Sequence, residues 1–481
     1  MKKLSEYEPQ KVLEFFELLS SVPHGSGNTK AIADICEKFA LERNLRYYRD
    51  NYNNTIIYKD ASEGVTSDPV IIQGHLDMVC VKDDGLELDM NKEPIRLMSD
   101  GKYLWADRTS LGADDTVAIA MALAILDDDS IIHPPICAVF TVDEETSMDG
   151  AKYLDKSKIS GDRLINIDSE KEGYITCGCA GAIKADCEFP FIKETVREDD
   201  LFFRISISGL LGGHSGIDIK YKRANAIILL SRVIYGLSLK WNIRLCSFKG
   251  GQFDNSIPLS AEAVIAVPDS EAEDAVRLGK LHQLMFQKEF YECERDISLN
   301  IDSAPSYEYC IPGKITKSFT RCIASIPNGL RSMSDKIEDL PAVSSNIGIA
   351  ELTESKIHFI TMIRSNEAGK KEELYEKIRL CVEHDEGKTT IINEYPEWVF
   401  KDHSPLRDTV VKAYKDLFNK DIKITATHGG LETAMFASFN DKLDMVSLGP
   451  EIIDIHSTRE RVELDSIDRV YTLLREVLKR L

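Results

Sequence analysis

Four short apolar runs in the sequence each lead into polar residues that can carry chemistry. Apolar runs of this length are typical of buried and largely parallel strands. We therefore expect the core of the chain to be a sheet built from these segments. The four runs are residues 70–74, 136–142, 163–167 and 444–448.

Segments with helical periodicity lie between these runs. Residues 113–129 form one such segment, and residues 465–481 form the last, with an apolar stripe along one side. Strands that alternate with helices indicate an open α/β sheet, and in such sheets functional residues gather at the carboxyl ends of the strands. The polar residues that follow the four runs stand at those ends and include His75, Asp77, Glu144, Glu145, Asp168 and His456.

A different pattern occupies the middle of the chain. Strand-like stretches such as residues 201–208 and 356–363 alternate there with helical ones. The pattern predicts an α+β domain inserted into a mostly parallel, helix-flanked α/β sheet, with room for two small α+β halves. A chain of 481 residues is also too long for one compact domain. We expect a catalytic domain formed by residues 1–183 and 396–481, and an inserted domain formed by residues 184–395.

The balance of charge and the cysteines narrow the functional class. The chain has 80 acidic and 59 basic residues and a formal net charge of −21, which argues against nucleic acid and anionic membranes as partners. No stretch approaches the roughly 20 apolar residues of a membrane helix. The eleven cysteines follow no disulfide framework, and the N-terminus lacks the apolar core of a secretory signal. We therefore expect a cytoplasmic protein with reduced thiols.

Two histidines and three carboxylates among the candidate residues form a set that can bind metal ions. Taken singly, each has an ordinary explanation, because a histidine after a strand is often structural and acidic residues at a helix start often act as caps. Together they offer nitrogen and oxygen ligands that suit Zn²⁺, and also Mn²⁺ or Co²⁺. A two-metal site needs a bridging carboxylate, and Asp114 can provide it. The candidate ligands are His75, Asp114, Glu145, Asp168 and His456.

Two further acidic residues stand beside these ligands. Asp77 follows His75 by two positions and can orient its imidazole. Glu144 adjoins Glu145 and can take a proton from an attacking water. The two residues are therefore candidates for orienting a metal ligand and for accepting a proton.

The order of these motifs resembles that of a known enzyme family, the dizinc metallopeptidases related to aminoacylase, carnosinase and carboxypeptidase G. The resemblance spans the chain and implies a zinc-aminopeptidase-like fold with a lid domain made of two ferredoxin-like halves. It also implies two divalent ions per chain, zinc above all, with manganese or cobalt as alternatives. The motifs that carry it are His75-Leu76-Asp77, Gly112-Ala113-Asp114-Asp115, Asp143-Glu144-Glu145, Asp168 and a late His456.

The resemblance assigns a role to each of these residues. Asp114 bridges the two ions, and the peptide bond that follows it, to Asp115, is cis. One ion is bound by His75 and Asp168, and the other by Glu145 and His456. The general base is Glu144, and the residue that orients the histidine is Asp77.

The resemblance further implies four groups of substrate-binding residues. His214 stands in a motif whose histidine stabilises the oxyanion, and Asn255 in a segment whose asparagine contacts substrate. Arg364 would hold the substrate's carboxylate, which its forked side chain suits, together with the turn formed by Gly429 and Gly430. Each group also has an ordinary alternative. The segment around His214 can be a simple glycine turn, and the one around Asn255 a turn into a strand. Arg364 can form a surface salt bridge, and Gly429 and Gly430 can be a plain turn at a helix start.

Within this family the chain is most similar to the aminoacyl-histidine dipeptidases. The similarity rests on total length, the long insertion, residues 20–27 and residues 428–432, although Gly429 stands where alanine is usual. We therefore expect hydrolysis of small peptides, above all Xaa-His dipeptides such as β-Ala-His, with broad specificity. A tripeptidase or an N-acyl-amino-acid deacylase is the enzymatic alternative, and a peptide-binding protein on a peptidase scaffold is the other. A homodimer formed through the lid domain and a monomer are both compatible with the sequence.

Overall fold

The computed structural model describes residues 4–481 and groups them into two compact units. The first, called the sheet unit, ends its first segment at Gly178 and resumes in Trp398–Ala426 and Leu431–Leu481. The second, called the inserted unit, comprises Cys179–Glu397 and Thr427–Gly430. The boundaries expected at residues 183 and 395 therefore shift slightly, because strand β9 (Gly181–Pro190) begins inside the inserted unit and residues 427–430 also group with it.

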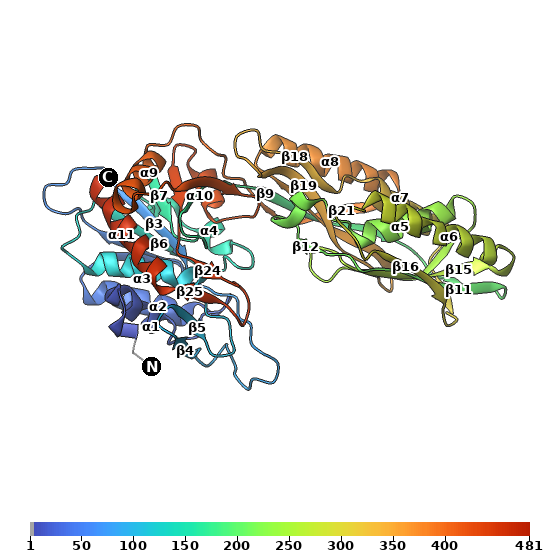
Figure 1. Cartoon of the computed structure of the whole chain (residues 1–481), viewed down its shortest axis with the longest axis horizontal. Coiled ribbons are helices and arrows are strands. Elements are labelled where there is room, and N and C mark those ends of the chain that lie inside the picture. The colour runs from blue at the N-terminus through green and yellow to red at the C-terminus, as the bar shows by residue number, and fades with distance from the viewer. Residues whose placement is uncertain (1–3) are drawn as a thin grey trace. The chain divides into compact units, whose positions relative to one another are not determined.

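The sheet unit is built on an eight-stranded sheet whose four central strands are parallel (Figure 1). These four strands coincide with the four apolar runs of the sequence and are almost entirely buried, as predicted. In spatial order they are β6 (Ile136–Thr141), β3 (Val70–His75), β7 (Arg163–Asn166) and β23 (Asp444–Ser447). The flanking strands are β1 (Arg46–Arg49) and β2 (Thr55–Lys59) at one edge, and β8 (Tyr174–Cys179) and β22 (Lys423–Thr427) at the other.

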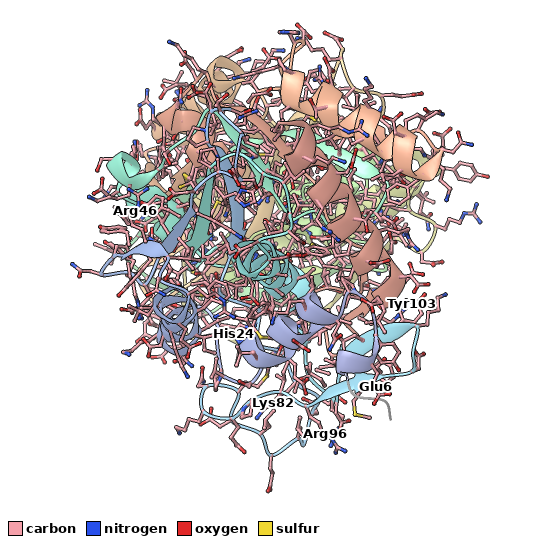
Figure 2. All side chains as sticks on the ribbon, turned by 90° about the vertical axis from the view of Figure 1, so that its left-hand side faces the viewer. Glu6, His24, Arg46, Lys82, Arg96 and Tyr103 are labelled. Carbon is pink, nitrogen blue, oxygen red and sulfur yellow. The ribbon has the colours of Figure 1, made fainter. Side chains whose placement is uncertain are left out.

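A smaller antiparallel sheet in the same unit joins segments that are far apart in the sequence. Its strands in spatial order are β24 (Ile452–Ile453), β25 (Arg461–Glu463), β5 (Tyr103–Ala106) and β4 (Leu97–Ser99). The hairpin formed by β24 and β25 carries His456 in its connecting loop. The other two strands, β5 and β4, come from an early part of the chain, and Figure 2 labels three residues of this part, Lys82, Arg96 and Tyr103. The sequence did not predict this sheet, because strands of two to four residues carry too little pattern.

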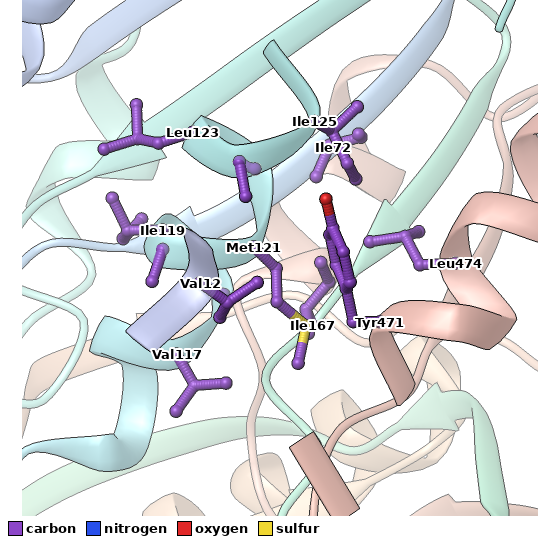
Figure 3. Close-up of a cluster of buried hydrophobic side chains, with 14 of the residues drawn as sticks. Val12, Ile72, Val117, Ile119, Met121, Leu123, Ile125, Ile167, Tyr471 and Leu474 are labelled. Carbon is purple, nitrogen blue, oxygen red and sulfur yellow. The ribbon is translucent and has the colours of Figure 1, made fainter. Parts of the chain in front are cut away.

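Helix α3 (Ala113–Asp127) forms the centre of the sheet unit's core. Its sequence is apolar on all sides, as expected for a fully buried helix, and it contacts β3, α1 (Gln10–Leu19) and α11 (Leu464–Arg480) (Figure 3). Truncating the buried Leu123 to alanine would cost roughly 2–5 kcal/mol. The remaining helices of the unit are α2 (Lys30–Glu42), α4 (Asp149–Tyr153), α9 (Pro405–Phe418) and α10 (Thr433–Phe439), with short 3₁₀ turns η1 (Leu4–Glu6) and η2 (Lys156–Lys158).

Glycine at position 74 lets the start of α3 approach the carboxyl end of β3. A Cβ atom at Gly74 would lie 2.6 Å from Asp115 Oδ2 and 2.7 Å from Ala118 Cβ. Both distances are shorter than ordinary van der Waals contact, so a larger residue would push the helix away from the strand. The absence of a side chain at this position is therefore one reason that Asp114 and His75 lie side by side.

The inserted unit contains one continuous sheet of nine strands. Helices α5 (Ala226–Ser238), α6 (Asp269–Glu289), α7 (Gly313–Ser325) and α8 (Ala368–His384) pack along it (Figure 1). The strands in spatial order are β16 (Ser298–Ser303), β11 (Asp200–Ser208), β15 (Ala261–Pro268), β13 (Arg244–Gly250), β19 (Pro341–Leu352), β20 (Lys356–Ser365), β9 and β21 (Lys388–Tyr395), with β18 (Gly329–Met333) paired to β19. Shorter elements are β10 (Glu194–Thr195), β12 (Gly213–His214), β14 (Ser256–Ile257), β17 (Tyr309–Cys310) and the turn η3 (Asp218–Tyr221).

This sheet consists of two β-α-β-β-α-β halves, the connectivity of the ferredoxin-like fold. The first half runs β11, α5, β13, β15, α6 and β16, and the second runs β9, α7, β19, β20, α8 and β21. The first half is inserted between the first strand and the first helix of the second. The halves join where Lys249 and Gly250 pair with Glu351 and Ala350. The prediction of two ferredoxin-like halves is confirmed.

The eleven cysteines are all free. Cys177 and Cys179 are both buried, and burial raises the pKa of Cys177 to about 12, so this thiol stays protonated. The pair therefore packs as small apolar side chains.

Across residues 4–481, none of the helices has both the length and the apolar character needed to cross a bilayer.

Candidate metal centre and substrate site

The structure brings the five predicted ligands together at the carboxyl edge of the central sheet. His75 is the last residue of β3, Asp114 lies at the start of α3, and Asp168 follows β7. Glu145 follows β6, and His456 lies in the loop of the β24–β25 hairpin. We call these five residues the metal cluster.

Asp114 is the residue that the two histidines share. His75 Nε2 lies 3.1 Å from Asp114 Oδ1, and His456 Nε2 lies 3.4 Å from Asp114 Oδ2. Each histidine also has a carboxylate of its own, because His75 Nε2 is 3.7 Å from Asp168 Oδ1 and His456 Nε2 is 2.9 Å from Glu145 Oε1. The five side chains thus form two halves that meet at one carboxylate, the pattern that a pair of bridged cations requires. The Asp114–Asp115 peptide bond is cis, as predicted.

The hydrogen bonds of His75 leave its Nε2 atom available for a cation. Its Nδ1 lies 2.9 Å from the main-chain oxygen of Asp77, which can only accept, so Nδ1 carries the proton. The lone pair of a neutral ring is then on Nε2, which faces Asp114 and Asp168. Among metal-binding histidines this arrangement, with the second nitrogen donating to a carbonyl, is the usual one.

Asp77 supports the base as well as the histidine. Its carboxylate accepts hydrogen bonds from the backbone N–H of Glu144 at 3.1 Å and of Glu145 at 3.3 Å, and from the hydroxyl of Ser26 at 2.7 Å. It lies 3.5 Å from His75 Nδ1. One buried carboxylate therefore holds the segment that carries the predicted base and a predicted ligand.

The electrostatics of the centre favour bound cations. Burial raises the pKa of Asp168 to about 8, with Asp114 adding to the effect, and burial also raises the pKa of Glu144 well above its usual value. Burial opposes ionisation of His456, yet its hydrogen bonds to Asp114 and Glu145 raise the pKa of its imidazole to about 11. Carboxylates crowded in a low-dielectric site behave in this way when no fixed positive charge compensates them, and divalent ions supply that charge. The nitrogen and oxygen donors therefore fit a metal pair.

Two neighbours of the cluster were not among the predicted site residues. Asp115 accepts a hydrogen bond from the backbone N–H of His75 at 3.1 Å and can also reach a cation with His75 and Asp168. Glu432 is fully buried, accepts from Gln73 Nε2 at 2.7 Å and bonds to the hydroxyl of Thr141. It ties the start of α10 to the ends of β3 and β6. Its place at the end of the segment 428–432, on which the family resemblance partly rests, was its signal in the sequence.

The inserted unit holds a second group of polar residues, which we call the arginine cluster. Arg364 is 5% exposed at the end of β20 and donates from one terminal nitrogen to the hydroxyl of Tyr395 at 2.8 Å. His428 Nε2 lies 2.7 Å from the hydroxyl of Ser344. Burial, together with Arg364, lowers the pKa of His428 to about 3 and also lowers the pKa of His214. The members of the cluster are His214, Ser344, Arg364, Tyr395 and His428.

The tautomer of His214 follows from its backbone contacts. The Nδ1 atom accepts hydrogen bonds from the N–H groups of Gly216 and Ile217, both at 3.2 Å. Because Nδ1 is an acceptor, the neutral ring carries its proton on Nε2 and presents that nitrogen as a donor. This is the form that the predicted role in stabilising an oxyanion requires.

The predicted Asn255 and glycine turn have different surroundings. The main-chain oxygen of Asn255 accepts from the N–H of Ser215 at 2.8 Å, while its side chain is exposed. The N–H of Gly429 donates to the hydroxyl of Thr427 at 3.0 Å. A Cβ at Gly430 would lie 2.8–2.9 Å from three atoms of the Tyr395 ring and hydroxyl, so this position needs glycine.

Comparison with known proteins gives the family. Residues 71–480 match the description "Peptidase family M20/M25/M40". The chain is 34% identical to the cytosol non-specific dipeptidase of Escherichia coli (strain K12), across 100% of this chain and 99% of that protein. The crystal structure of aminoacylhistidine dipeptidase from Vibrio alginolyticus is 29% identical with a TM-score of 0.89, covering 100% of this chain and 98% of that one. A tripeptidase from Staphylococcus aureus, 15% identical with a TM-score of 0.57 over 98% of both chains, shares the fold.

The matches to the two dipeptidases extend over the whole sheet unit and the whole insertion. The resemblance inferred from the motif order is confirmed at the level of the family. The chain belongs to peptidase family M20/M25/M40 and is a peptide hydrolase.

Proposed function

We propose that this peptidase is a dipeptidase that uses two divalent cations held by the metal cluster. The observation that carries the proposal is the position of Asp114, whose two oxygens face His75 Nε2 at 3.1 Å and His456 Nε2 at 3.4 Å. His75 and Asp168 would hold one ion, Glu145 and His456 would hold the other, and Asp114 would be the ligand that both ions share. Zinc fits the mixed nitrogen and oxygen donors best, and manganese and cobalt are alternatives.

When bound, the metal pair supplies Lewis-acid polarisation of the scissile carbonyl and lowers the pKa of the attacking water. Glu144 takes the proton from that water as it attacks and then passes it to the leaving amine. Asp77 keeps Glu144 in place through the hydrogen bond to its backbone at 3.1 Å.

The arginine cluster is proposed to recognise the substrate. Its one permanent cation, Arg364, pairs with the C-terminal carboxylate of the dipeptide, and the Gly429–Gly430 turn offers backbone N–H groups to the same carboxylate. His214, neutral and protonated on Nε2, donates to the carbonyl oxygen as negative charge develops there. Asn255 contributes a further polar contact from its exposed side chain.

Xaa-His dipeptides, including β-Ala-His, are the proposed preferred substrates within a broad dipeptide range. The names of two relatives support this choice, since one is an aminoacylhistidine dipeptidase and the other a non-specific dipeptidase. The name of the second relative and the eleven free cysteines also support a cytoplasmic location. Formation of a homodimer through the inserted unit stays a prediction, which the molar mass in solution would test.

The test of the proposed function is a Glu144→Gln variant assayed with its metal content. We expect two equivalents of metal per chain in both proteins and a loss of activity on dipeptides of roughly 10²–10⁴-fold in the variant. Asp143→Asn is the matched control, because Asp143 is adjacent and its carboxylate binds the N–H of Gly27 at 2.6 Å. Substantial activity in Glu144→Gln would remove the base assignment. A panel of Xaa-His dipeptides, tripeptides and N-acyl amino acids would separate the proposed substrate class from the alternatives.

A further inference from the structure

Glu460 makes three hydrogen bonds to consecutive backbone N–H groups. Its carboxylate is 2% exposed and accepts from Leu111 at 2.9 Å, from Gly112 at 3.2 Å and from Ala113 at 2.8 Å. These three residues directly precede Asp114. Three converging N–H groups at the start of a helix form a strong anion site, so one side chain fixes the backbone from which Asp114 projects.

The same residue is also part of the hairpin that carries His456. Glu460 follows His456 by four positions, and its N–H donates to the main-chain oxygen of Ser457 at 3.2 Å. It directly precedes β25, which pairs with β5. Packing alone holds the histidine weakly, since the side chain of His456 is 43% exposed. The loop also contains two non-glycine residues with φ of +55°, at Asp454 and His456, a conformation that persists only where surrounding contacts enforce it.

An ordinary helix cap would explain only part of this arrangement. The N-terminal position of α3 is Gly112, which has no side chain with which to cap, so Glu460 supplies the cap from a distant part of the chain. A cap could come from any segment. This one comes from the loop that holds His456, and it binds the loop that holds Asp114. The contact therefore links two of the three residues proposed to hold the same ion.

We propose that Glu460 is a positioning residue that sets the spacing between Asp114 and His456, and so determines the affinity of the ion that these two share with Glu145. This inference rests on the proposed function, because it needs the two-metal site. The ion assigned to His75 and Asp168 depends less on Glu460, because Asp114 is its only proposed ligand that belongs to the loops that Glu460 joins.

The test is titration of metal-free protein with Co²⁺ or Zn²⁺ alone, without substrate. At pH 8 the carboxylate is charged, since burial raises the pKa of Glu460 only to about 7. In Glu460→Gln an NH2 group replaces one carboxylate oxygen, and this group cannot accept a hydrogen bond from the backbone N–H groups that it faces. We expect the affinity for one ion to fall by roughly 10–100-fold, the range seen for partners of metal ligands. The other ion should lose less affinity, because it shares only Asp114, and the visible spectrum of the cobalt protein should change mainly for one ion.

Glu463→Gln is the matched control. Glu463 lies three positions further along, in β25, and its carboxylate is 3.7 Å from Arg469, with no contact to the loop before Asp114 among the described residues. Both ions should bind this variant with wild-type affinity. Glu460→Asp keeps the charge but shortens the side chain, so an intermediate loss is expected, and it replaces the glutamine variant if that protein does not fold.

The outcomes separate the two proposals. If wild-type protein binds fewer than two ions, the proposed function fails. If the wild type binds two ions and Glu460→Gln binds both with unchanged affinity and spectrum, the role of Glu460 is wrong and the proposed function stands. A lower melting temperature of the metal-free variant with unchanged ion affinity would mean that Glu460 only stabilises the fold.

Discussion

The metal cluster and the arginine cluster differ in the sign of the charge that they bury. The metal cluster crowds carboxylates, and burial raises the pKa of Asp168 to about 8, so the site is completed by cations. The arginine cluster holds one cation among neutral groups, and burial beside Arg364 lowers the pKa of His428 to about 3. In the proposed function the carboxylate of the substrate completes this site. Burial acts in both places against charge. Each site is therefore prepared for a ligand of the sign that it lacks.

The two clusters also differ in how they are held. The metal cluster lies at the end of a parallel sheet, where Asp77 and Glu460 fix its ligands through backbone N–H groups. The arginine cluster is assembled from five separate segments of the inserted unit, and two side-chain hydrogen bonds, between Ser344 and His428 and between Arg364 and Tyr395, join its members. We expect substitutions in the first to abolish metal binding and turnover, and substitutions in the second to change substrate preference and stability.

The largest expected effect is the loss of the shared carboxylate. Asp114→Asn keeps the shape of the side chain but weakens the bridge between the two cations, so both should bind poorly. We expect kcat/KM on dipeptides to fall by at least about 10³-fold, because several kcal/mol of transition-state stabilisation depend on the ions. Elemental analysis of the purified variant checks the cause, and a chelator applied to the wild type should give the same loss. Two ions retained in Asp114→Asn would show that the carboxylate does not bridge.

Arg364→Met should have the next largest effect, and only on substrates with a free carboxylate. A charge-assisted pair of this kind is worth roughly 1.5–3 kcal/mol, so kcat/KM on a dipeptide should fall by about 10²-fold while two metal ions stay bound. The corresponding dipeptide amide, which lacks the carboxylate, should be hydrolysed slowly and equally by both proteins. Arg204→Met is the control, because Arg204 lies exposed on β11 of the same unit. Equal losses on the dipeptide and its amide would remove the assigned role of Arg364.

The same contrast between the clusters explains what could be predicted from the sequence. The four central strands and most of the metal cluster were predictable, because these ligands and the base follow an apolar run or start a helix, and parallel strands place such residues at one edge. His456 is the exception, because it lies in the loop of the β24–β25 hairpin, which the sequence did not predict. Glu432 and Glu460 were missed as partners, since their hydrogen bonds join segments hundreds of residues apart. Asp115 was missed because its hydrogen bond goes to the backbone N–H of His75, which leaves no pattern in the sequence. In the arginine cluster, Ser344, Tyr395 and His428 were not predicted as a group, because the fold of the insertion, and no spacing in the sequence, brings them to Arg364.

The smallest expected effect concerns the pH dependence of stability in the arginine cluster. In the folded protein the pKa of His428 is about 3, which is below the ordinary value of 6.5. Between these two pH values the ring is neutral in the native protein, whereas the same ring in the unfolded chain binds a proton. The contribution of this neutral ring is fully present above pH 6.5 and is lost as the pH falls toward 3, at about 1.4 kcal/mol per pH unit. In His428→Gln the free energy of unfolding of the inserted unit should fall less steeply between pH 6.5 and 4.5, by about that amount per unit. Urea unfolding monitored at several pH values measures the slope, and His384→Gln, at an exposed position near the end of α8, should leave it unchanged. Identical slopes for wild type and His428→Gln would mean that the imidazole titrates normally, and the arginine cluster would then gain positive charge in mild acid, unlike the site described above.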